Sequence, residues 1–172
     1  MGLSVAERGR RLSTFRFVQV RLMEIAAAWT PTTPEMEVKV LLGRHIWDLA
    51  QHADALGKRT FELRLPAQHS LRPAEDYVRL LHDVAALEPT AERLAALYDA
   101  VLPGLDQRYA RYLEASDPLL DAPSRVIVER IRADLARLRA EAQAVRAELG
   151  LAAADPAAWR DRERALADLV AA

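Results

Sequence analysis

Two of the four histidines in this 172-residue chain, His45 and His52, lie seven residues apart with Asp48 between them. Helical residues three and four apart lie on one face, so these three side chains can converge on one patch. Imidazole nitrogen and carboxylate oxygen together suit iron, manganese or zinc. Because the chain contains no cysteine, a metal would have to be held by histidine and carboxylate. The segment therefore predicts a metal site or the remains of one.

Two further carboxylates are candidates for the same site. Asp134 falls on an apolar stripe with Ile127, Ile131 and Leu138, where a charge is costly to bury unless it is paired or bound to a cation. Glu24 lies on a neighbouring stripe of the first long helix and can lean inward. A metal site in a bundle core needs ligands from several helices, because each helix donates only one or two.

Other roles compete with metal binding. A histidine at the edge of an apolar face can simply hydrogen-bond a neighbouring helix, and Asp48 or Asp134 can pair with an arginine such as Arg44. A metal-free enzyme is a third hypothesis, in which His45 or His52 is a general base oriented by Asp48.

Hydrophobic periodicity predicts five or six helices and no strand. The apolar stripe of the second helix contains both histidines, and it consists of Val38, Leu42, His45, Leu49, His52 and Leu56. The expected helices cover about 5–29, 34–63 and 74–87, a segment from EPTAER past Tyr112, a segment from Asp121 or Ser124 to Leu149, and a last segment from Asp155-Pro156.

The third long helix carries three tyrosines on its apolar stripe, Tyr98, Tyr109 and Tyr112. They are candidates to line a pocket or to serve as redox neighbours of a metal, although a tyrosine stripe is more often part of the core. Pro103-Gly104 lies inside this helix and predicts a kink or a break. The last segment is amphipathic and can pack on the bundle or on a second copy; its apolar residues are Trp159, Leu166, Leu169 and Val170.

Composition indicates one all-α domain spanning residues 1–172. Apolar residues make up 51% of the chain and charged residues 28%, and glycine is scarce at six. The formal charge of −1 gives no electrostatic reason to expect nucleic acid or an anionic membrane as partner. No apolar run is long enough to span a bilayer, and the N-terminus lacks a secretory signal, so we expect a cytoplasmic protein.

At TPEMEVKVLLGRHIWDLAQHADALGKRTFELR the chain resembles the ferritin-like helical-bundle proteins, in particular a bacterial branch with a similar second helix. That branch also has a similar segment, DPLLDAPSRVIVERIRADL, leading into the fourth helix. The resemblance covers roughly residues 15 to 140. It implies a four-helix bundle that holds two iron or manganese ions, by one glutamate and one Glu-x-x-His pair from each half, and uses them to activate dioxygen.

Within this resemblance, His52 matches the histidine of the first pair, and Glu24 matches the lone glutamate of the first helix. The chain departs from the pattern on three helices. On the third long helix no glutamate falls on the inward stripe, and Tyr98 occupies one such position, with Asp99 beside it. Leu49 stands where the first pair has its carboxylate. Asp134 can stand for the acid of the second pair, but Arg137 follows it where the pattern has histidine.

These observations predict a metal-dependent oxidoreductase that acts on a small molecule, with iron or manganese as cofactor. The alternative is a metal-free ferritin-like bundle that binds a small molecule or another protein. A homodimer is also expected, because an alanine-rich amphipathic helix beyond a bundle usually covers a further surface.

Overall fold

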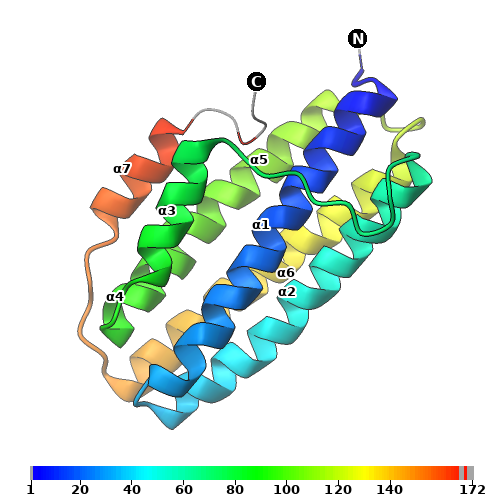
Figure 1. Ribbon diagram of the computed structural model, residues 1–172. Helices are drawn as coiled ribbons and strands as arrows, with labels where there is room; N and C mark the ends of the chain where they lie inside the picture. Colours follow the sequence, from blue (N-terminus) through cyan, green and yellow to red (C-terminus); the bar gives the residue numbers. More distant parts are fainter. Residues whose placement is uncertain (1, 167–168, 170–172) are drawn as a thin grey trace.

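The computed structural model describes residues 2–166 and residue 169, and all their regular secondary structure is helical. The all-α prediction is confirmed. Three long helices, α1 (Val5–Thr32), α2 (Met36–Glu62) and α6 (Ala122–Leu149), lie beside a fourth, composite helix (Figure 1). The composite helix consists of α4 (Thr90–Leu94), the π-helix η1 (Ala95–Val101) and α5 (Leu102–Ala115).

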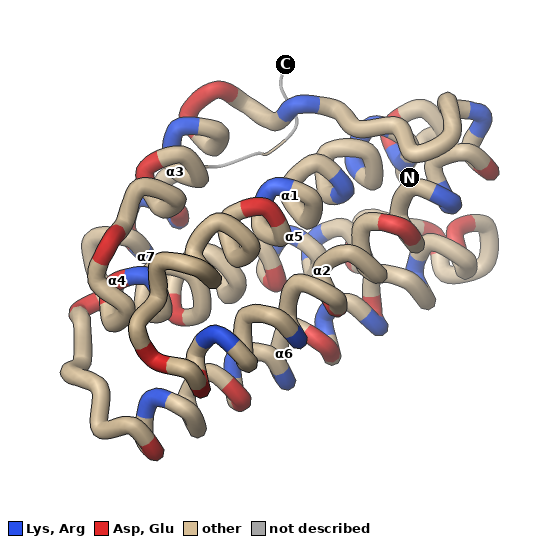
Figure 2. The backbone as a smooth tube through the Cα atoms, turned by 60° about the horizontal axis from the view of Figure 1, so that its bottom comes forward, with Lys and Arg blue, Asp and Glu red and all other residues tan. Residues whose placement is uncertain are grey.

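Two short helices, α3 (Glu75–Ala85) and α7 (Ala157–Ala165), lie together on one side of this assembly (Figure 1). The connection from α2 to α3 crosses α1, and there the Leu71 amide donates to the Ser13 carbonyl at 3.1 Å. No helix in the described part of the chain is long and apolar enough to cross a membrane. Acidic and basic positions are interspersed along the helices (Figure 2).

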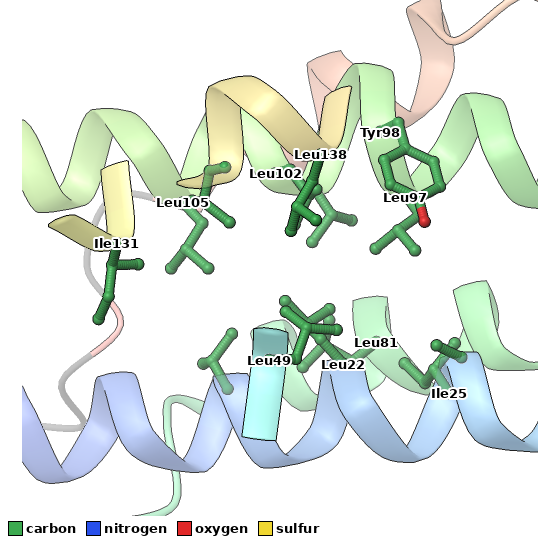
Figure 3. Close-up of a cluster of buried hydrophobic side chains, with 14 of the residues drawn as sticks. Leu22, Ile25, Leu49, Leu81, Leu97, Tyr98, Leu102, Leu105, Ile131 and Leu138 are labelled. Atoms are coloured by element: carbon green, nitrogen blue, oxygen red, sulfur yellow. The ribbon is translucent and has the colours of Figure 1, made fainter. Parts of the chain in front are cut away.

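The predicted apolar stripes form the core. Side chains of α1, α2 and α3, such as Leu22, Leu49 and Leu81, point toward those of the composite helix and α6, such as Leu105 and Leu138 (Figure 3). All five are at most 2% exposed. Burying a leucine side chain contributes roughly 1.5–3 kcal/mol, so this shared core favours the association of the helices.

The helix ends follow local rules. α1 begins with a capping box in which the Glu7 amide donates to Ser4 Oγ at 3.2 Å and the Ser4 amide donates to Glu7 Oε2 at 2.7 Å. α6 ends at Gly150, as predicted, because this residue has a φ of 59°, which glycine adopts without strain. α1 continues to Thr32, past its expected end, with Pro31 in its last turn.

The sequence predicted a kink or a break at Pro103, and the composite helix is not broken there. Instead the hydrogen bonding widens in the preceding turn, where the Leu102 amide donates to the Leu97 carbonyl five residues earlier. A proline has no amide hydrogen, so the carbonyls before Pro103 lose the donor that a regular helix would give them. The prediction of a local irregularity is therefore met by a π-helix.

Arginines replace the missing donors. Arg139 Nε donates to the Tyr98 carbonyl at 3.1 Å, and Arg160 Nε donates to the Asp99 carbonyl at 2.7 Å. The first arginine comes from α6 and the second from α7. The irregular turn is thus held in place by two other helices.

The last helix, α7, was expected to pack either on the bundle or on a second copy. In the structure Trp159 and Leu166 pack against the core of the bundle. Buried Glu163 of α7 pairs with Arg108 of α5, and a Cβ added to Gly104 would lie 1.9 Å from the Glu163 carboxylate. Any larger residue at position 104 would therefore displace Glu163 and the helix α7 that carries it. Val170 lies outside the described residues.

Candidate functional site

The two predicted histidines of α2 face Glu141 and Asp134 of α6, which runs antiparallel to α2. We call this contact between the two helices the seam. His45 Nε2 lies 3.0 Å from Glu141 Oε2, and His52 Nε2 lies 3.0 Å from Asp134 Oδ2. Both rings are buried, because the stripe of α2 that carries them faces the core. The structure thus brings His52 together with Asp134, as expected, and gives His45 a partner that the sequence interpretation missed.

The second ring nitrogen of each histidine, Nδ1, also lies close to a polar atom. His45 Nδ1 lies 2.7 Å from the Tyr98 hydroxyl, and His52 Nδ1 lies 3.3 Å from Gln19 Oε1. Gln19 in turn donates to the Tyr109 hydroxyl at 2.7 Å. A carboxylate oxygen only accepts, so a neutral His45 donates to Glu141 through Nε2 and accepts the hydrogen bond of the Tyr98 hydroxyl through Nδ1. His52 faces an acceptor on each side, Asp134 Oδ2 and Gln19 Oε1, so a neutral His52 ring donates to only one of them.

Two polar chains therefore run from buried tyrosines to the surface of the bundle. One consists of Tyr98, His45 and Glu141, and the other of Tyr109, Gln19, His52 and Asp134. Burial raises the pKa of both tyrosines, which keeps their hydroxyls protonated.

Burial also determines the charge of the histidines. It lowers the pKa of His45 and of His52, although the facing carboxylates Glu141 and Asp134 act in the opposite direction. Burial would raise the pKa of the two carboxylates, but hydrogen bonds from the histidines and from Arg137 outweigh it and lower their pKa. Near neutral pH the seam thus pairs neutral imidazoles with ionised carboxylates.

The positive charge in this cluster comes from Arg137. Its guanidinium contacts Asp48 at 3.1 Å, Asp134 at 3.2 Å and Glu141 at 3.1 Å. Asp48 therefore joins the cluster through Arg137, whereas the alternative expectation paired it with Arg44. Together, α2 and α6 hold three carboxylates around one guanidinium.

These residues do not fit a metal centre as they are arranged. In the described part of the chain, no group of three or more histidine, aspartate or glutamate side chains is placed so that it could hold a metal ion. Both nitrogens of His45 have hydrogen-bond partners, His52 lies between Asp134 and Gln19, and the carboxylates share Arg137. A metal would have to displace these contacts.

Glu24 lies apart from the cluster. Its side chain is about half exposed and pairs with Arg21, one turn earlier on α1, at 2.9 Å. Neighbouring Ile25 is buried, and one residue along a helix turns the side chain by about 100°. The expectation that Glu24 leans inward fails for this reason.

The three tyrosines are packed in the core, which is the alternative to the pocket-lining role. Tyr98 and Tyr109 belong to the polar chains, whereas the Tyr112 hydroxyl donates to buried Asp121 Oδ2 at 2.5 Å. Phe15 packs edge-on against Tyr109 and Tyr112, with ring centroids 4.6 and 5.9 Å away.

A hollow lies on the surface beside the cluster. It has a volume of about 360 Å³, and Trp47, His52, Asp134 and Val126 are among its lining residues. A second, more open hollow lies on the other side of Trp47 and includes Gly43. None of the three tyrosines lines either of them.

Sequence reasoning missed Gln19 and Glu141. For Glu141 a signal was present, because Asp134, Arg137 and Glu141 are spaced by three and four residues and share one face of α6. For Gln19 we find no such signal.

Comparison of the chain with known protein families, with characterised proteins and with solved structures gave no match.

Proposed function

We propose that this protein is a metal-free helical bundle of the ferritin-like type that acts as a protein-interaction module. The observation that carries the proposal is the position of Arg137. It follows Asp134 by three residues, where the ferritin-like pattern has a metal-binding histidine, and its guanidinium contacts all three carboxylates of the cluster.

An arginine can do the electrostatic work of a metal ion in such a cluster. Its guanidinium is permanently charged and offers five N–H donors in a planar array, so one side chain can neutralise several carboxylates. It offers no open coordination position for dioxygen. The polar seam then has a structural role, and the surface of the bundle carries the function.

The outer face of α2 is the surface that supports an interaction function. Trp47 is 67% exposed there, and Met36, Val40 and Phe61 are each more than half exposed on the same helix. Large exposed apolar side chains that gather on one face are typical of sites where another molecule binds.

A small molecule in the hollow beside Trp47 is a second candidate. Its volume of about 360 Å³ falls within the usual range of ligand sites, roughly 300–1,000 Å³. Ala55 lines this hollow, so Ala55→Phe would fill it. A compound that raises the Tm of the wild type but not that of Ala55→Phe would favour this candidate.

The metal content of the protein tests the proposal. The chain is purified without chelator and without a histidine tag, incubated with ferrous iron or manganese, desalted, and analysed for metal per chain. We expect none to be retained by the wild type. Arg137→His should gain affinity for a divalent metal, because it removes the internal cation and adds a ligand next to Asp134.

Ala136→His is the control for this experiment. It places the same new imidazole on α6, at an exposed position on a different face of the helix from Asp134, and leaves Arg137 in place. One or two iron or manganese ions per wild-type chain would overturn the proposal and favour the alternative, a metal-dependent oxidoreductase. Equal metal binding by both histidine variants would show that Arg137 does not control the site.

A further inference from the structure

The exposed face of α2 carries an ordered pattern of side chains. From the N-terminal end of the helix, its exposed or half-exposed members are Met36, Val40, Gly43, Arg44, Trp47, Gln51, Asp54, Ala55, Lys58 and Phe61. Val126 of α6, which is 65% exposed, lines the hollow next to the second half of this face. Together these residues form what we call the α2 face.

Gly43 has no intramolecular explanation. It lies in the middle of a long helix, where glycine costs about 1 kcal/mol relative to alanine, and an added Cβ would meet nothing within 4 Å. A glycine on an exposed helix surface permits close approach by another chain. Trp47 stands one turn further along the same face, between the two surface hollows.

The α2 face is complementary to the same face of a second copy whose α2 runs in the opposite direction. With a two-fold axis near Leu49, Met36 of one copy meets Phe61 of the other, and Arg44 meets Asp54. Gly43 meets Ala55, so the two smallest residues of the face lie opposite each other. Such reciprocal contacts are what a two-fold symmetric interface requires.

In this antiparallel pair, Trp47 of each copy lies next to the hollow of the other copy. Opposite Trp47 lies Gln51 of the second copy, at the edge of the hollow that Ala55, Val126 and Ile127 help to line. The indole of each copy can thus enter the hollow of the other. Tryptophan anchors seated in partly apolar hollows contribute more than most residues to the stability of protein interfaces.

Charge complementarity supports the same register. Arg44 has no hydrogen bond or ion pair with any other described residue, whereas Asp54 is partly exposed and already attracts cations, as its ion pair with Lys58 shows. In the reversed pair, Arg44 and Asp54 come together twice. The aliphatic part of Lys58 then covers Val40.

We infer that two copies of this chain associate in antiparallel orientation through the α2 face, with Trp47 of each copy seated in the hollow beside Ala55 of the other. This inference rests on the proposed function, because it names the partner of the interaction surface. The metal experiment and the association experiment have separate readouts, so each can fail without the other.

Sedimentation equilibrium of the full chain over a range of concentrations tests the inference. We expect twice the 19.2 kDa of one chain for the wild type. Trp47→Lys and Gly43→Gln should each weaken association at least tenfold. Gly43→Gln is informative because an added Cβ meets nothing within 4 Å in its own chain and glutamine favours helix over glycine, so we expect its monomer to fold and to resist heat better than the wild-type monomer.

A charge-reversal pair tests the register. Arg44→Glu and Asp54→Arg should each weaken association, and the double variant should restore it, because the two charges exchange places across the interface. Val5→Lys, at an exposed position on α1, is the control and should leave the dimer intact.

Two results would overturn the inference. One is a wild type that remains monomeric at all concentrations, which would leave the α2 face to a different protein or the hollow to a small molecule. The other is a dimer that persists in Trp47→Lys and Gly43→Gln, which would place the association on another surface.

Discussion

Replacing Arg137 with methionine removes the shared cation of Asp48, Asp134 and Glu141 and keeps an unbranched side chain of good helix propensity. Arg137 is 44% exposed, so solvent screens each ion pair to about 0.2–1 kcal/mol. Three such pairs predict a loss of roughly 1–2 kcal/mol in the free energy of unfolding near pH 8. For a chain of this length the Tm falls by roughly 3–6 °C.

The same variant should behave differently in mild acid. In the wild type, burial lowers the pKa of His45, and the charge of Arg137 adds to this lowering. Without Arg137, the ring binds a proton at higher pH and supplies a positive charge beside Glu141. The stability difference between Arg137→Met and the wild type should therefore be smaller near pH 6 than near pH 8.

Urea unfolding followed by circular dichroism at both pH values measures this difference. Arg130→Met is the control near pH 8, because Arg130 is an exposed arginine of the same helix for which the described residues offer no ion pair. Its charge adds to the lowering of the His52 pKa by burial, so the control is not compared near pH 6. The reasoning is refuted if Arg137→Met is as stable as the wild type near pH 8, or if its loss equals that of the control.

Two other perturbations test the buried histidines of the seam and the packing of α7 on Gly104. Burial lowers the pKa of His45 and His52 below the 6.5 of the unfolded chain, so the unfolded chain binds more protons below that pH. Stability should therefore fall as the pH drops from about 6.5 through the folded-state pKa, and replacing both histidines with glutamine should remove this part of the slope in urea unfolding. Gly104→Ala places a Cβ 1.9 Å from the Glu163 carboxylate, so α7 should lose protection in hydrogen exchange. Gly43→Ala, whose Cβ meets nothing within 4 Å, should leave α7 protected; equal exchange in both variants would contradict this account.

Much of the fold could be predicted because it follows from local patterns. The three- and four-residue spacing of apolar residues identified every long helix and its buried stripe, and Gly150 marked the end of α6. The π-helix could not be predicted in detail. Pro103 signals that donors are missing, but only the folded chain shows that Arg139 and Arg160 supply them from other helices.

The candidate site was predictable to a smaller extent. The stripe of α2 placed His45 and His52 at a buried seam, and that placement is confirmed. Their partners depend on the rotation and alignment of α6 and α1 against α2, which a single helical pattern does not specify. Glu141 and Gln19 were missed for this reason, although one sits on the same face of α6 as Asp134.

The polar seam in turn fixes the alignment of α2 against α6. His45 and His52 are seven residues apart, and so are Glu141 and Asp134, which is about two turns in each helix. Apolar residues alone tolerate a shift of two turns, because their pattern repeats over the same interval. Such a shift would leave one buried histidine without its carboxylate partner, and an unsatisfied buried polar group costs about 1–3 kcal/mol. The seam thus selects one alignment, and with it the position of Trp47 on the outer face of α2.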